Sequence, residues 1–93
     1  MGKGRKFLEN VVLDADSGAE AILYQPIVEI SGDRRVLIEN HCGVKVYSRE
    51  NIVVRVKYGC VCVNGVAMEL QRMTKEQLII CGKINAVTLQ RRG

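Results

Sequence analysis

Residues 60–72 read Cys-Val-Cys-Val-Asn-Gly-Val-Ala-Met-Glu-Leu-Gln-Arg, two apolar-rich stretches on either side of an Asn-Gly pair. Asn and Gly both tolerate positive φ, which a two-residue type I′ hairpin turn requires. The stretch therefore predicts two antiparallel strands, at residues 60–63 and 67–72, joined by a tight turn at Asn64 and Gly65. Because residues 60–63 are apolar on both faces, we expect that strand to be central in its sheet or to lie in an interface.

The same alternation of strand and turn continues in both directions from this hairpin. Short runs rich in Val, Ile and Leu recur about every 8 residues, a spacing typical of all-β domains. Antiparallel hairpins in a meander or a sandwich are the first expectation. A short β-solenoid is the alternative, since residues 61–65 and 79–82 echo each other. The sequence predicts about eight strands, at 27–30, 35–39, 44–47, 52–57, 60–63, 67–72, 78–80 and 84–89.

The predicted core follows from side chains that alternate between two faces of each strand. Apolar residues gather on one face of most strands, while charged residues such as Arg55 and Glu69 take the other. We expect the core to contain Val36, Ile38, Val44, Val46, Ile52, Val54, Val56, Val61, Val63, Met68, Leu70, Leu78, Ile80, Val87 and Leu89.

Residues 1–25 have a different pattern from the rest of the chain. Apolar residues recur at helical spacing around Phe7 and Val11, and Pro26 ends any helix there. We therefore expect a short helical or flexible segment over 1–25 and a β domain over 26–93. No apolar run reaches the ~18 residues of a spanning helix, and the basic start lacks a signal-like apolar region, so we expect a cytoplasmic protein.

The charge pattern favours protein partners over nucleic acid. The net charge is +4, and Lys45, Arg55 and Lys57 lie on strand faces opposite apolar ones. Single-strand binders also need aromatic stacking platforms, and the chain has 3 Tyr, 1 Phe and no Trp. A weak nucleic-acid-binding domain is the alternative function. The basic residues at the N-terminus support at most a peripheral contact with a membrane.

The order of strands and turns resembles the YabP/YqfC family of sporulation proteins, and the YqfC branch most closely. The resemblance spans residues 26–89, and its most specific part is the run Ile38-Glu39-Asn40-His41-Cys42-Gly43-Val44. The other stretches that carry it are residues 26–32, Tyr47-Ser48, Ile52, 59–65 and 78–87.

The resemblance implies a small protein made in the mother cell of an endospore-forming bacterium. It implies no reaction and no cofactor. It suggests self-association or contact with another sporulation protein, of which a YqfD-like membrane protein is one example. Turn or interaction roles are expected for Glu39, Asn40, His41, Gly43, Asn64, Gly65 and Gly82.

Metal binding and catalysis are the less favoured interpretations of the reactive residues. Cys60 and Cys62 are expected to face the same side of one strand, without the Cys-x₂₋₄-Cys spacing of most zinc sites. Free cysteine also packs as a small buried hydrophobe, which is the favoured reading for all four cysteines. His41 stands beside Cys42, but adjacent residues point apart and no third group orients them. We expect no metal ligands and no catalytic residues.

These features together predict a non-enzymatic interaction or assembly module. Apolar residues on both faces of two strands leave a chain of 93 residues with little to bury them against. Such surfaces are typical of sites that contact a second copy or another protein.

Overall fold

The computed structural model describes residues 25–92, which form one all-β domain. The helical segment expected before Pro26 lies outside these residues. Six strands follow one another along the chain: β1 Ile27–Ser31, β2 Arg35–Glu39, β3 Val44–Tyr47, β4 Asn51–Val56, β5 Gly59–Met73 and β6 Gln77–Arg91. Residues 25–92 contain no helix, and the all-β prediction is confirmed.

All strand pairs are antiparallel, and they form one sheet in the order β1-β2-β6-β5-β4-β3. Strands β3 to β6 form a meander, and β2 joins it by pairing with β6. β5 and β6 are therefore interior strands, as expected from the residues that are apolar on both faces. The parallel coils of a solenoid are not found among the described strands.

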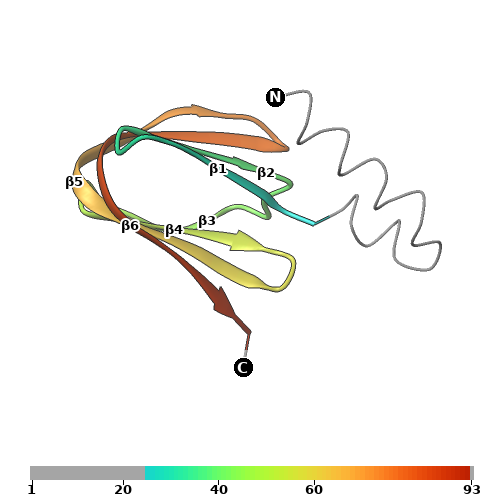
Figure 1. Ribbon diagram of the computed structural model, residues 1–93. Coiled ribbons are helices and arrows are strands. Elements are labelled where there is room, and N and C mark those ends of the chain that lie inside the picture. Colours follow the sequence, from blue (N-terminus) through green and yellow to red (C-terminus); the bar gives the residue numbers. More distant parts are fainter. Residues whose placement is uncertain (1–24, 93) are drawn as a thin grey trace, which may run out of the picture.

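β5 and β6 have 15 residues each and bend midway, so that the sheet folds over on itself (Figure 1). We call the two halves the upper and lower layers. The upper layer contains β1, β2 and the paired segments 69–73 of β5 and 78–81 of β6. The lower layer contains β3, β4 and the paired segments 59–64 and 86–91. A single bent hairpin thus supplies strands to both layers.

The predicted hairpin turn at Asn64 and Gly65 is wrong, because both residues lie inside β5. The register of β5 against β6 shifts between them, and it shifts again between Val66 and Glu69. Such bulges bend a strand and increase its twist. The chain therefore continues as one bent strand where a tight turn was expected.

The expected strands at 78–80 and 84–89 are likewise one continuous strand, β6. This accounts for the remaining difference between eight expected strands and six. Gly82 lies within β6, with φ +145, and a Cβ there would stand 2.7 Å from the Cα of Met68. A Cβ on Gly65 would collide with the carbonyl oxygen of Lys83. The two glycines let β5 and β6 approach closely at the bend. The similar segments 61–65 and 79–82 thus lie on the two adjacent strands at the bend of the sheet.

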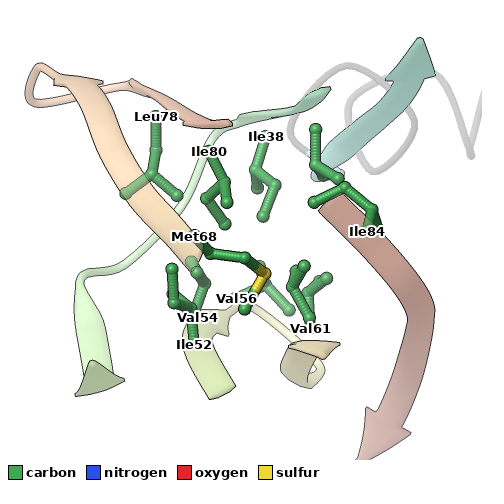
Figure 2. Packing of buried hydrophobic residues seen from close by; sticks show 11 residues of the cluster. Ile38, Ile52, Val54, Val56, Val61, Met68, Leu78, Ile80 and Ile84 are labelled. Atoms are coloured by element: carbon green, nitrogen blue, oxygen red, sulfur yellow. The ribbon is translucent and has the colours of Figure 1, made fainter. Parts of the chain in front are cut away.

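The core lies between the two layers, with side chains from β2, β4, β5 and β6 (Figure 2). Of the fifteen expected core residues, ten are fully or almost fully buried. These ten are Val36, Ile38, Ile52, Val54, Val56, Val61, Val63, Met68, Leu78 and Ile80. Val44, Leu70 and Val87 are partly buried and pack against this cluster.

Two expected core residues are exposed, and two buried ones were missed. Val46 is 39% exposed, because a bulge in β3 pairs Val44 with Val54 but Val46 with Val53, on the other face. Leu89 is 58% exposed, since β2 extends along β6 only as far as Cys81 and leaves the second half of β6 at the rim of the sheet. Ile79 and Ile84 are each 8% exposed.

Candidate functional site at the β1 edge

β1 is one edge of the sheet, and little in the described residues shields it. It pairs with β2 along all five residues without a bulge, and its outer side has no strand partner among residues 25–92. Its sequence, Ile-Val-Glu-Ile-Ser, contains no lysine, arginine or proline. Natural proteins usually block edge strands with such residues or with bulges. Within residues 25–92, the outer backbone groups of β1 therefore have no strand to pair with.

Two apolar side chains of β1 are exposed beside its outer backbone groups. Ile27 and Ile30 are 46% and 51% exposed. Ile30 lies opposite Val36, a fully buried core residue. Directly opposite residues of an antiparallel pair share a face, so Ile30 extends the core side of the upper layer beyond the region that the lower layer covers. The β1 edge is thus an incompletely buried continuation of the core.

The opposite edge, β3, is protected in ways that β1 is not. It has only 4 residues, a bulge between Val44 and Val46, and Lys45 at that bulge. The hydroxyl of Tyr47 accepts a hydrogen bond of 3.5 Å from the backbone N–H of Leu70. Tyr47 therefore covers part of β5. These features favour pairing through β1 over pairing through β3.

Four of the residues singled out in the sequence, Glu39, Asn40, His41 and Gly43, gather where β2 leaves the sheet. The N–H of Asn40 donates to the carbonyl of Glu76 at 2.7 Å, and the Gln77 amide donates to Glu39 at 3.1 Å. Asn40 has φ 62, a conformation that Asn tolerates better than most residues. The β2–β3 loop is therefore fastened to the turn between β5 and β6.

His41 completes this attachment. Its Nδ1 accepts a hydrogen bond of 3.0 Å from the Gly43 backbone N–H, so the ring proton is on Nε2. Nε2 lies 2.8 Å from the carbonyl oxygen of Thr74, to which it donates. Both ring nitrogens are thus engaged by the backbone. The side chain holds two loops together and is not oriented as a general base.

Replacing His41 with alanine is expected to lower the free energy of unfolding by about 2 kcal/mol, because two hydrogen bonds worth about 1 kcal/mol each are lost. Urea denaturation measures this directly. His41→Asn is the matched variant, since its amide oxygen can still accept from Gly43 but cannot reach Thr74. It should lose about half as much. A loss below ~0.5 kcal/mol for His41→Ala would contradict this role.

The other three singled-out residues lie at the bend of the sheet, apart from the His41 loop. Gly65 is buried and Gly82 half-buried. Asn64 is exposed, and its side-chain amide donates to the Asn51 side chain on the neighbouring strand at 3.0 Å. The seven residues thus form two separate structural groups, and none of them belongs to β1. β1 carries one charged residue, Glu29, and its sequence alone gives no signal that it lies at the edge of the sheet.

The four cysteines are free thiols, of which Cys42 is exposed and the other three are partly buried, so the expectation that they pack as small buried hydrophobes is wrong. Cys60 and Cys62 flank buried Val61 and share the outer face of β5, as predicted. Within residues 25–92, no three His, Cys, Asp or Glu side chains converge as metal ligands would. Cys62 and Cys81 each lie near a glutamine side chain, at 3.6 and 3.1 Å.

The comparisons with known proteins identify the family. The model of the YabP family matches residues 25–93, most of the chain and all of the sheet. The chain belongs to the YabP family. This membership confirms the family resemblance and is consistent with a role connected with sporulation. No curated protein and no solved structure matched. In the described part of this YabP-family chain, no helix is long and apolar enough to cross a membrane.

Proposed function

We propose that this YabP-family protein acts in endospore formation as a non-enzymatic assembly module that pairs with a second copy through β1. The open β1 edge carries the proposal. Two identical edge strands can pair antiparallel about a two-fold axis, which continues the sheet from one copy into the next. The contrast between the two edges supports a closed dimer, because β3 is too protected to extend a chain of copies.

The pairing register follows from charge and burial. A two-fold axis at Ile30 places the two Ile30 side chains opposite each other on the core side of the joined sheet. Glu29 then lies opposite Ser31, and the two Glu29 carboxylates are not opposed. Like charges directly opposite each other in a sheet are destabilising. Burial of both isoleucines supplies the favourable free energy, at about 25 cal/mol per Å² of apolar area.

A charge exchange at Ile30 tests the proposed dimer. Ile30→Lys and Ile30→Glu, each alone, are expected to be monomeric, since equal charges meet at the axis. A mixture of the two should restore the dimer, because opposite charges then meet. Light scattering of the separate and mixed samples measures this. Restoration on mixing also shows that the variants are folded.

The matched control is Val46→Lys, which makes a comparable change on the β3 edge. Val46 is also exposed and apolar, so the surface loses a similar residue and gains the same charge. The dimer should persist in this variant. Dissociation by Val46→Lys but not by Ile30→Lys would move the interface to β3, and failure of the mixed Ile30 variants to associate would refute the register.

A further inference from the structure

A basic recess lies on the lower layer, away from β1. Its volume is about 640 Å³, within the range of about 300–1,000 Å³ typical of small-ligand sites. It is formed by the β2–β3 loop, β3, the end of β4, the turn from β4 to β5 with the start of β5, and the end of β6. Its charged side chains are all basic: Lys45, Arg55, Lys57, Arg91 and Arg92.

No carboxylate of residues 25–92 lines the recess with these charges. The described residues that line the recess include no aspartate or glutamate, and the one ion pair among residues 25–92 joins Arg49 to Glu69 elsewhere. Five cations gathered around one hollow repel one another, and a bound anion relieves that repulsion. The net charge of +4 is thus smaller than the positive charge around this single recess.

The backbone around the recess is fixed. Arg55 forms backbone hydrogen bonds of 2.7 Å with both Cys42 and Gly43. The backbone N–H of Arg92 donates to the Tyr58 carbonyl at 2.8 Å, and its guanidinium donates to the Lys57 carbonyl at 3.4 Å. A Cβ on Gly59 would collide with the Gln90 carbonyl. The turn therefore packs against the end of β6, and these bonds fix the backbone that carries the basic residues.

We infer that this recess binds a phosphate-bearing anion. Guanidinium groups match the geometry of phosphate oxygens and form paired, charge-assisted hydrogen bonds, and three of the five basic residues are arginines. No aromatic side chain lines the recess, so stacking of nucleic-acid bases has no platform there. The phosphate can come from a soluble ester or from a lipid headgroup.

Pyrophosphate is the soluble probe, titrated into the full chain by calorimetry at constant ionic strength. Saturable binding is expected, about tenfold weaker in Arg55→Gln, since a charge-assisted hydrogen bond is lost. Arg72→Gln is the matched control. It removes the same charge from an exposed position outside the recess, and affinity should not change. Absence of saturable binding to both pyrophosphate and vesicles, or equal losses in the two variants, would overturn the site.

Vesicles distinguish the two sources of phosphate. Sedimentation with phosphatidylglycerol but not phosphatidylcholine vesicles, reduced in Arg55→Gln alone, would identify a lipid headgroup. Pyrophosphate binding without vesicle binding would identify a soluble ester. If Arg55→Gln and Arg72→Gln weaken binding of duplex DNA equally, while pyrophosphate does not bind, the attraction is diffuse and the recess is not a site. None of these outcomes depends on pairing through β1.

Discussion

Replacing Gly65 with alanine is expected to lower the free energy of unfolding by about 3 kcal/mol, near the upper end of overpacking effects. The added methyl group would meet the Lys83 carbonyl and lie 2.8 Å from the sulfur of Met68. Backbone cannot move aside as a flexible side chain can, so β5 and β6 must separate at the bend. Chemical denaturation measures the loss, which is a large share of the ~5–15 kcal/mol that stabilises a typical domain.

Two further variants separate crowding from backbone strain. Gly32→Ala places alanine at φ 58 with no atom within 4 Å, so it should cost only the ~1 kcal/mol of a left-handed conformation. Gly65→Asn distinguishes a bent strand from a hairpin turn. Asn suits a type I′ turn better than Ala does, but its larger side chain suits the crowded bend worse. A milder effect for Asn than for Ala would contradict the bent strand.

Replacing Met68 with alanine is expected to cost about 2–5 kcal/mol. Met68 is fully buried, and its side chain lies between residues of the two layers, beside the bend (Figure 2). Its removal leaves a cavity that the neighbouring β-branched residues, with restricted rotamers, fill poorly. Thermal or urea unfolding measures the effect.

The matched control is Met73→Ala, the same substitution on the same strand. Met73 is 50% exposed, so its loss should change stability by no more than ~0.5 kcal/mol. Equal effects at the two positions would mean that the layers do not meet at Met68. A small effect at both would contradict the folded-over sheet.

Much of the fold could be predicted from local alternation. The strands at 35–39 and 44–47 begin and end where expected, because turn-forming residues follow each of them: Asn40 after the first and Ser48 after the second. The Asn64-Gly65 error has a physical cause: a tight turn and a close approach of two strands both need a residue without Cβ. Only the path of β6, which is distant in sequence, distinguishes them.

The basic recess, the role of His41 and the free β1 edge could be predicted from the sequence only in small part. Lys45, Arg55 and Lys57 could be placed on outward faces, but Arg91 and Arg92 join them only because β6 returns beside the β4–β5 turn. The role of His41 likewise depends on Thr74, 33 residues away. The free edge of β1 could not be inferred, since alternation within one strand does not determine which neighbours it pairs with.

The most direct test of the assembly proposal is the mass of the full chain in solution, measured by light scattering behind a sizing column over about a tenfold range of concentration. We predict that the mass rises with concentration and levels off at twice that of the chain. A monomer throughout, or growth without a limit, would contradict a closed dimer through β1.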